Sequence, residues 1–522
     1  MSTATSQAAP LSAYAIHVDA RDNVAVAKVP VPRGTLVQVG GNIVEVLDDV
    51  PPGHRFALVV IPDGDFVRQY GQPIGTSKGV TAGALISRAN MSNDVPVVRE
   101  LDEDMHTAAP EYVPESQRAT FMGYRRPDGR VGIRNWILIV PTSMCAAHEA
   151  VQIATVAEFT LFDKAKYPNV DGVTAIPHNK GCGCSDGSNI EVMLRTLAAY
   201  ADHPNVAGVV FIGLGCEKTN LTVMEKYLND QHRPLNKPVA RIGIQDAGGT
   251  QGAVKRGLEA VEAMLPVANQ ITRTPTPISE LSLGVKCGGS DGFSGLSANP
   301  ALGRAADELV RQGGTVLITE VPEFCGAEHI LAWRAKDATT GHAVYDMVDW
   351  YKDYASKFGT VLNENPSPGN VAGGLLNITI KSLGAIAKAG TTRVEGVVGY
   401  AEQPKGRGLY LMQGPGYDQE STPGLIASGA QLVVFTTGRG TTIGNAIAPV
   451  LKLASNNPIF ERMKSDLDMS AGDVIDGTRS IDEVGLEVFE HVRRVASGEM
   501  LGKSEENKHR EFQVWAEQSV SL

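Results

Sequence analysis

Three apolar runs in this chain each lead into a polar loop rich in glycine. Residues 281–285 precede Cys287-Gly288-Gly289-Ser290-Asp291, residues 209–212 precede Gly213–Glu217, and residues 432–435 precede Thr436–Gly440. Glycine accepts positive φ angles and has no Cβ, so such loops leave backbone amides open to a ligand. In α/β enzymes the ligand lies at the carboxyl ends of parallel strands. The pattern therefore predicts an α/β enzyme whose site is formed by several strand ends.

The length and the net charge of the chain limit the number of domains and the kinds of ligand that can be expected. A chain of 522 residues is too long for one hydrophobic core, so two to four domains are expected. Apolar residues make up 43% and charged residues 20%, which is ordinary for a globular protein. The net charge of −11 argues against general nucleic-acid binding, which needs a basic surface. It leaves room for a small anionic substrate in a locally positive site.

The distribution of cysteines and the lack of a long apolar segment in the sequence indicate in which cellular compartment the protein is expected. No apolar run reaches the roughly 20 residues that a membrane-spanning helix needs, and residues 1–10 lack the features of a signal peptide. The six cysteines are scattered, unlike the disulfide framework of a small secreted domain. We expect a cytoplasmic homo-oligomer with reduced thiols that binds neither nucleic acid nor membranes.

Segments rich in proline and glycine indicate where one domain of the chain ends and the next begins. Residues 11–90 contain short β-rich runs broken by Pro-Arg-Gly and Pro-Pro-Gly, which predicts a small β domain that docks beside a larger body. Residues 91–120 lose periodicity and read as an extended acidic linker. From residue 121 buried strands alternate with helices, which indicates βαβ units and mainly parallel sheets. The proline-containing stretch 272–277 is expected to be a break between blocks 121–275 and 280–505, which are two domains or two lobes of one.

Four cysteines invite a metal hypothesis. Cys145, Cys182, Cys216 and Cys287 each fall in a glycine- or hydroxyl-rich segment near a predicted strand end, so together they could bind iron or an iron–sulfur cluster. The single residue between Cys182 and Cys184 is a shorter gap than zinc sites use. Cysteine is also a small and commonly buried residue, and the spacing alone favours that plainer explanation.

Charged and polar side chains at strand ends supply the remaining candidates. Glu320 follows the predicted strand 315–319, and His178 has the same position after 173–176. Arg439, between two glycines, is suited to clamp a carboxylate, although a surface turn would also use such a residue. Lys381 is a further candidate base on residue type alone. No dinucleotide fingerprint and no Walker lysine occur, which argues against a nicotinamide oxidoreductase.

These motifs together resemble the altronate/galactarate dehydratase family of sugar-acid dehydratases over nearly the whole chain. The segments that carry the resemblance are Asp22–Ala25, Gly53-His54, Tyr70-Gly71, Ile74-Gly75, Gly213–Glu217, Cys287–Asp291, Ser297–Pro300, Asn365–Asn370 and Thr437–Gly440. The resemblance implies a small N-terminal SAF-type β domain followed by a large α/β catalytic body. It also implies an iron-dependent enzyme that dehydrates a six-carbon aldonic or aldaric acid to a 2-keto-3-deoxy product.

Two departures from the family pattern bear on the substrate. The family typically has a histidine three residues before the Asp-Asn of its first motif, and Asp19 stands there in this chain. The segment Gly181–Ser185 is richer in thiols than the usual form. Residues 319–323 and 326–328 look closer to the altronate branch than to the galactarate branch.

The resemblance and the residues together give a set of expected roles. Fe²⁺ would be bound by Cys287, Cys216, Glu217, His54 and Asp19, with an iron–sulfur cluster as the alternative. Substrate would contact Gly288, Gly289, Ser290, Arg439, Asn370 and Asn23. The catalytic acids and bases would come from Asp291, Glu320, His178 and Lys381, among which the base stays open. A lyase of the same family that expels sulfite, and a non-catalytic sugar-acid-binding protein, are the competing hypotheses.

Overall fold

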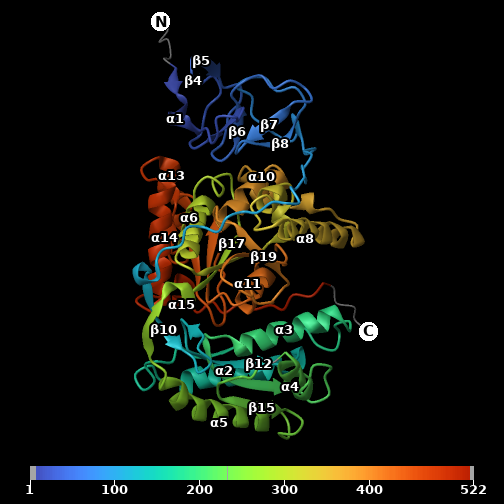
Figure 1. Cartoon of the computed structure of the whole chain (residues 1–522), viewed down its shortest axis with the longest axis vertical. Coiled ribbons are helices and arrows are strands. Elements are labelled where there is room, and N and C mark those ends of the chain that lie inside the picture. The colour runs from blue at the N-terminus through green and yellow to red at the C-terminus, as the bar shows by residue number, and fades with distance from the viewer. Residues whose placement is uncertain (1–7, 232, 518–522) are drawn as a thin grey trace.

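The chain forms three parts stacked along its long axis, as the computed structural model shows (Figure 1). The structure describes residues 8–231 and 233–517. A small β domain lies at the top, the C-terminal α/β domain in the middle and a second α/β domain at the bottom (Figure 1). Within the described residues, no helix has the length and apolar character needed to cross a bilayer.

The N-terminal domain consists of short strands in three small sheets. Strands β3 (Val24–Ala27) and β6 (Arg55–Ala57) pair antiparallel and are fully buried. The domain docks on the C-terminal domain: the Arg55 guanidinium donates to the Gly374 carbonyl, and Asn377 Nδ2 donates to the Ile74 carbonyl at 2.8 Å. A Cβ at Gly53, where φ is +81°, would lie 2.9 Å from the Gly373 carbonyl oxygen, so glycine permits this approach.

Residues 93–119 run as an extended segment along the C-terminal domain rather than away from it. The Arg99 guanidinium pairs with Asp349 on α8 (Ala338–Lys357) and with Glu328, both at 2.7 Å. The Trp333 indole donates to the Glu100 carbonyl at 3.0 Å. These contacts hold the connection between the small domain and the rest of the chain against the surface.

The second domain contains a parallel sheet of four strands in the order β13-β12-β14-β15. Its strands are β12 (Trp136–Pro141), β13 (Gly172–Ala175), β14 (Val206–Gly213) and β15 (Val239–Gly243). Helices α2 (Ala147–Thr160) and α5 (Thr250–Asn269) cover one face. Helix α3 (Ser188–Asp202) covers the other face and also packs against the C-terminal domain, so one core joins the two domains.

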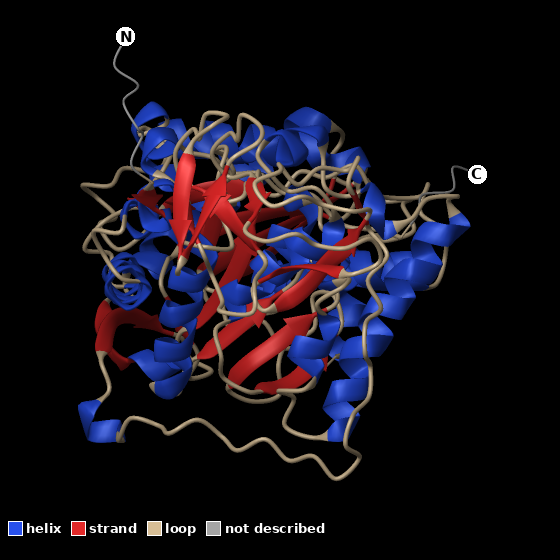
Figure 2. Ribbon diagram, turned by 90° about the horizontal axis from the view of Figure 1, so that it is seen from above, coloured by secondary structure: helices blue, strands red, loops and turns tan. Residues whose placement is uncertain are grey.

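The C-terminal domain is built on a parallel sheet of seven strands in the order β19-β20-β18-β17-β21-β22-β23. Its strands are β17 (Ser282–Cys287), β18 (Thr315–Ile318), β19 (Val394–Val398), β20 (Gly408–Met412), β21 (Leu432–Thr437), β22 (Val450–Ala454) and β23 (Met469–Ser470). Helices α6 (Ala298–Arg311) and α14 (Ile481–Ala496) cover one face, and α11 (Asp418–Ala427) covers the other. From above, the strands lie in the interior with helices around them (Figure 2). The predicted fold class is confirmed.

The stretch 272–277, expected as the break between the two α/β blocks, lies at their boundary and forms a strand. Strand β16 (Arg273–Pro277) pairs antiparallel with β10 (Thr120–Arg125) in a separate sheet of three strands, ordered β11 (Val131–Gly132), β10 and β16. Proline cannot donate to a sheet, but it is tolerated on an edge strand that pairs on one side only. Strands β10 and β16 therefore lie side by side where the chain enters and leaves the second domain.

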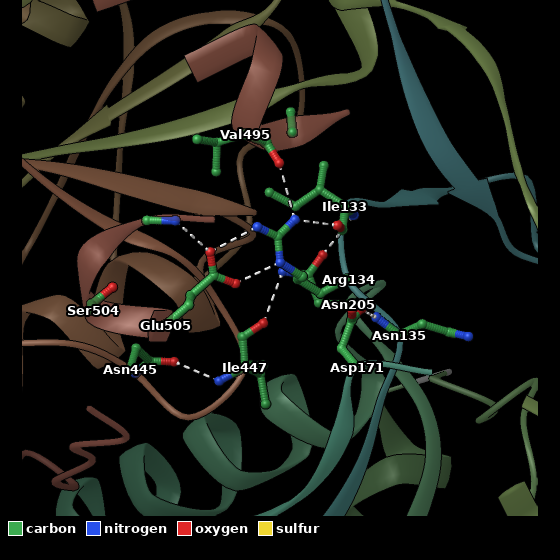
Figure 3. A network of polar contacts seen from close by, with 12 residues as sticks. Ile133, Arg134, Asn135, Asp171, Asn205, Asn445, Ile447, Val495, Ser504 and Glu505 are labelled. Carbon is green, nitrogen blue, oxygen red and sulfur yellow. Dashed lines mark hydrogen bonds and ion pairs between the residues drawn. The ribbon is translucent and has the colours of Figure 1, made fainter. Parts of the chain in front are cut away.

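Arg134 links the second domain to the C-terminal domain from a fully buried position (Figure 3). Its guanidinium binds both carboxylate oxygens of Glu505 at 2.6 and 2.8 Å, and it also donates to the carbonyls of Ile133 and Val495. Burial alone would lower the Arg134 pKa, but the Glu505 carboxylate raises it above its usual value. Removing either partner would leave a buried charge without its counter-ion.

We expect Arg134→Ala to lower the free energy of unfolding by about 3–5 kcal/mol, because Glu505 and two carbonyls lose their donor. Urea unfolding followed by circular dichroism measures the change. Arg407→Ala is the matched control, since its pair with Glu280 lies on the surface and should cost less than about 1 kcal/mol. Equal effects of the two substitutions would contradict the role of Arg134 as an interdomain contact.

Candidate active site

The carboxyl ends of β17, β18 and β21 meet at one edge of the large sheet. Cys287 is opposite Thr436, and Val285 is opposite Ile318, in the parallel register. The edge opens into a pocket of about 370 Å³, a size suited to a small ligand. The lining residues are Cys287, Gly288, Gly289, Glu323, Glu364, Asn365, Ser367, Asn370, Lys381, Gly416, Tyr417 and Asp418.

A network of buried charges forms the floor of this pocket. Lys286 lies between Glu320 at 2.6 Å and Asp418 at 2.8 Å. Lys388, on the 3-10 helix η6 (Ile386–Ala389), contacts the other Glu320 oxygen at 3.0 Å. Lys286, Glu320 and Lys388 are completely shielded from solvent. Each charge therefore depends on its partners for compensation.

Cys287 and Glu323 connect the floor to the pocket. Lys388 donates to the Cys287 sulfur at 3.2 Å, and the thiol lies 3.3 Å from Glu323 Oε2. Lys381, on α10 (Ile378–Ala385), pairs with Glu323 Oε1 at 2.8 Å and donates to Asn365 Oδ1 at 2.9 Å. A carboxylate and an ammonium thus lie side by side in the wall of the pocket.

The local electrostatics set the protonation of these groups. Burial raises the pKa of the Cys287 thiol, and Glu323 adds to the effect, so this cysteine stays a neutral thiol. Burial would raise the Glu323 pKa, but Lys381 and Lys388 outweigh it and lower the pKa below its usual value. The opposing carboxylates and the Cys287 sulfur raise the pKa of Lys381 despite burial. At neutral pH, Glu323 is ionised and Lys381 is charged.

Glu320 adopts a backbone conformation that is uncommon for a residue with a side chain. Its φ and ψ angles are 74° and 52°, in the left-handed region, immediately before the 3-10 helix η4 (Val321–Phe324). Such a conformation costs about 1–3 kcal/mol and persists when surrounding contacts require it. Here Glu320 accepts from Lys286, Lys388 and the Cys287 backbone amide at 3.0 Å. The strain is offset by these contacts, which hold the carboxylate beneath the pocket.

Asp291 holds the glycine-rich loop together. Its Oδ1 accepts from Ser294 and from the Ser455 hydroxyl at 2.9 Å, and its Oδ2 accepts from Asn456 at 3.0 Å. Asn370 Nδ2 donates to the Ser290 carbonyl at 2.8 Å. The Asp291 carboxylate is therefore surrounded by donors from its own loop and from the residues that follow β22.

The glycines of the loop allow it to approach the charged floor. A Cβ at Gly288 would lie 2.8 Å from both carboxylate oxygens of Asp418. Gly289 has a φ of +58°. Arg439 is exposed at the rim, and its Nε lies 3.7 Å from the position that a Cβ on Gly369 would take. The structure thus brings together five of the expected site residues: Gly288, Gly289, Asn370, Lys381 and Arg439.

Three of the predicted site residues, Asp19, Asn23 and His54, belong to the N-terminal domain. Arg21 binds Asp19 at 2.9 Å, and this hydrogen bond holds the Asp19 pKa well below its usual range. Asn23 bridges Phe66 and Arg68 through its side-chain amide. His54 is half-buried, which lowers its pKa, and its backbone nitrogen lies 3.3 Å from the Cβ position of Gly374. His54 is therefore placed at the contact with the C-terminal domain, next to the Gly373-Gly374 pair.

His178, Cys216 and Glu217 belong to the second domain and not to this pocket. The His178 ring contacts the Pro141 carbonyl at 3.1 Å and accepts from the Lys180 amide at 3.2 Å, while burial lowers its pKa to about 4. Glu217 accepts from Thr142 Oγ1 and from two backbone amides of its own loop. The structure thus separates the predicted metal ligands into different domains.

A divalent ion would meet unfavourable surroundings at Cys287. Cys287, Glu320 and Glu323 offer ligand atoms that all lie within 4.8 Å of one another. However, Lys286, Lys381 and Lys388 contact these same groups at 2.6 to 3.2 Å. Three lysines already balance the carboxylates of Glu320, Glu323 and Asp418, so no net negative charge is left to attract an added cation. The donor set suits an anion-binding or acid–base site better than a metal centre.

Lys286, Lys388 and Asp418 received no role from the sequence. The sequence does contain a feature that could have indicated the two lysines. Lys286 directly follows the apolar run 281–285, and Lys388 lies in the small apolar segment 383–390. A lone charge inside an apolar segment indicates either a surface position or a buried ion pair, and only the fold distinguishes the two.

Family models match the chain along most of its length. The models described as altronate/galactarate dehydratase SAF domain, as D-galactarate dehydratase/altronate hydrolase second domain, and as D-galactarate/altronate dehydratase C-terminal match residues 13–94, 123–269 and 278–520. The three matched segments correspond to the three parts of the fold.

Curated relatives agree with this assignment. Altronate dehydratase of Bacillus subtilis is 34% identical, with 96% of this chain and 98% of the relative covered. Galactarate dehydratase (L-threo-forming) of Escherichia coli is 36% identical, with 93% of each chain covered. The (2R)-sulfolactate sulfo-lyase subunit beta of Chromohalobacter salexigens is 33% identical, over 76% of this chain and 97% of the subunit.

We expect Glu320→Gln to lower the free energy of unfolding by about 3–5 kcal/mol, because Lys286 and Lys388 lose their shared counter-ion. Chemical denaturation measures the change. Glu364→Gln is the matched control: this carboxylate lines the same pocket but is exposed, and its loss should stay within about 0.5 kcal/mol. A Glu320→Gln protein as stable as the control would rule out the proposed charge balance.

Proposed function

Because the chain belongs to the altronate/galactarate dehydratase family, it is a hydro-lyase of the sugar-acid dehydratase type, and we propose that its substrate is altronate. The product would be the corresponding 2-keto-3-deoxy acid. The observation that carries the proposal is the pocket at the end of β17, where an ionised carboxylate and a charged lysine lie side by side.

The reaction requires a base and a proton donor. A base removes the proton from C2 of the 2,3-dihydroxy acid, and the C3 hydroxyl takes up a proton and leaves as water. The enol that results takes up a proton at C3 and loses the proton of its C2 hydroxyl, which gives the 2-keto-3-deoxy acid. Positive charge near the carboxylate stabilises the negative charge that develops as the C2 proton leaves.

We assign the role of base to Glu323. Its carboxylate lines the pocket and is ionised because Lys381 and Lys388 lower its pKa. Glu320 is less suited, since it is completely buried beneath Cys287 and its oxygens accept from Lys286 and Lys388. Asp291 is likewise engaged by its own loop. Both are better placed to position the loop than to take a proton.

We assign to Lys381 and Arg439 the binding of the substrate carboxylate. They would also stabilise the negative charge of the enolate that forms when the C2 proton leaves. Lys381 lines the pocket, and its raised pKa keeps it protonated. The Arg439 guanidinium has no ion pair in the described chain and is free to make a bidentate contact with a carboxylate. The buried Ser290 hydroxyl has no hydrogen-bond partner among residues 8–231 and 233–517, which supports a further contact to a substrate hydroxyl.

The charges of the lining favour one substrate carboxylate over two. Glu323, Glu364 and Asp418 line the pocket beside a single lysine, with Arg439 at the rim. An aldaric acid such as galactarate would bring its second carboxylate towards acidic side chains. The same argument disfavours sulfite as a leaving group, because extra positive charge would be needed to stabilise it. Because one relative is a sulfo-lyase subunit, a sulfonated hydroxy acid must be tested as a substrate beside the sugar acids.

We propose iron as the cofactor. Because Lys286, Lys381 and Lys388 surround Cys287, we propose that the iron is bound elsewhere. When bound, iron would supply Lewis-acid chemistry or a structural centre. We further propose a cytoplasmic location and a homo-oligomer. All six cysteines are free, in keeping with a reducing compartment.

The substrate proposal predicts a difference in kcat/KM. Purified enzyme should convert altronate to a 2-keto-3-deoxy acid at least about tenfold more efficiently than galactarate, a difference of about 1.4 kcal/mol in transition-state binding. A coupled assay for the keto acid, run on both sugar acids and on 2-sulfolactate under anaerobic conditions with ferrous iron, measures this. Preference for galactarate would overturn the charge argument, and sulfite release without dehydration would replace the proposed reaction.

The role of Glu323 predicts that Glu323→Gln lowers kcat by about 10²- to 10⁴-fold. Because the lysines lower the Glu323 pKa, the carboxylate stays ionised as the pH falls, and kcat/KM of the wild type should stay flat from pH 7 down to about pH 5. Glu364→Gln is the matched control on the same pocket and should keep kcat within about threefold. A Glu323→Gln enzyme that keeps kcat would remove this residue from the chemistry.

A further inference from the structure

Three cysteines outside the proposed active site follow three neighbouring strands of the second domain. Cys145 follows the central strand β12, Cys182 follows β13, and Cys216 follows β14. Since β13 and β14 flank β12 in a parallel sheet, their carboxyl ends lie at one edge. The three thiols thus come from adjacent loops of a single domain, whereas Cys287 belongs to the other sheet.

The three loops are bound to one another. The Met144 amide donates to the Lys180 carbonyl at 2.7 Å, which joins the loops after β12 and β13. Thr219 Oγ1 donates to the Thr142 carbonyl at 2.7 Å, which joins the loops after β12 and β14. The Lys218 amide donates to the Cys182 sulfur at 3.4 Å, which joins the loops after β13 and β14. The edge is a fixed arrangement and not three independent loops.

The thiols at this edge are exposed, which is unusual for cysteine. Cys145, Cys182 and Cys216 are all exposed and free, while Cys184 in the same loop is buried. Nothing lies within 4 Å of the Cβ position of Gly183, so the loop between the two cysteines leaves space beside it. Side-chain and backbone amides already approach two of the sulfurs: Gln245 Nε2 lies 3.8 Å from Cys216, and the Lys218 amide donates to Cys182. Hydrogen bonds of this kind are typical of sulfur ligands in iron–sulfur centres.

The three thiols do not form a ready-made site for a single ion. One tetrahedral ion with metal–sulfur bonds of about 2.3 Å would draw its thiolates to about 3.8 Å from one another. Among the described residues, the only three-ligand group within 4.8 Å is the one at Cys287, so the loop thiols are spaced more widely. In a cluster each thiolate binds a different iron, and the sulfurs are correspondingly further apart.

We propose that Cys145, Cys182 and Cys216 bind a [4Fe–4S] cluster through three thiolates, with the fourth iron lacking a protein ligand from this set. The inference goes beyond the proposed function, because it rests on the loops of the second domain and not on the pocket at β17. An iron without a protein ligand can bind water or an oxygen of a small molecule, and it is also the iron that oxidation removes first.

The protein purified anaerobically tests the proposal directly. We expect about four irons and four acid-labile sulfides per chain, a broad visible absorption, and the electron paramagnetic resonance signal of a three-iron cluster after mild oxidation. Cys145→Ser, Cys182→Ser and Cys216→Ser should each lose most of the iron and sulfide. Because these side chains are exposed, thermal unfolding of the apo forms should match that of wild-type apo protein.

Two further variants serve as matched controls. Cys184→Ser alters a buried thiol of the same loop, and Cys325→Ser alters a thiol of the C-terminal domain; both should keep their iron and sulfide. Iron that survives the three exposed-thiol substitutions, or metal that is zinc without sulfide, would overturn the proposal. Altronate turnover measured on the same samples separates the two claims, since an inactive wild type that holds the cluster would reject only the proposed function.

Discussion

The charges buried at the end of β17 must neutralise one another, and this constraint determines the geometry of the candidate active site. Lys286 and Lys388 are inaccessible to solvent, so an unpaired ammonium there would cost several kcal/mol. Glu320 compensates both, and it reaches them from a left-handed backbone conformation at the end of β18. The loop after β18, the helical segment that carries Lys388 and the start of α11 are held in place by this charge pairing. The pocket lies on top of it.

The two α/β domains place different side chains at equivalent strand ends. At the large sheet, three lysines occupy the space around Cys287 and its carboxylates, which suits anions and proton transfer. At the small sheet, the thiols are exposed, and backbone and side-chain amides are the donors that approach them. Arg134 and helix α3 join the domains, so the two edges belong to domains that share a buried ion pair and one core.

The sequence predicted most of the fold and part of the site. Long apolar runs such as 209–212 identified their strands because fully buried parallel strands have little other pattern. The prolines of 272–277 marked the boundary between the two blocks but concealed that this stretch pairs as an edge strand. The structure places the loop at Cys287–Asp291, Lys381 and Arg439 near one another, and their roles stay a prediction. The four thiols could not be sorted by sequence, since all follow strands and only the order of the strands separates Cys287 from the others. Lys388 was missed because a buried lysine and an exposed one look alike until their partners are known.

The N-terminal domain contributes to the site through close backbone approach more than through Asp19. The Asp19 carboxylate is already bound to Arg21 within its own domain. By contrast, a Cβ on Gly292 or on Gly374 would lie 2.1 or 2.2 Å from the Gly53 carbonyl oxygen, so side chains there would clash with the small domain. The Tyr70 hydroxyl likewise lies close to Gly295 and Gly384. Gly292 directly follows Asp291 in the glycine-rich loop. The small domain thus packs directly on the loop that forms the wall of the pocket, and its Arg55 guanidinium donates to the Gly374 carbonyl at the same contact.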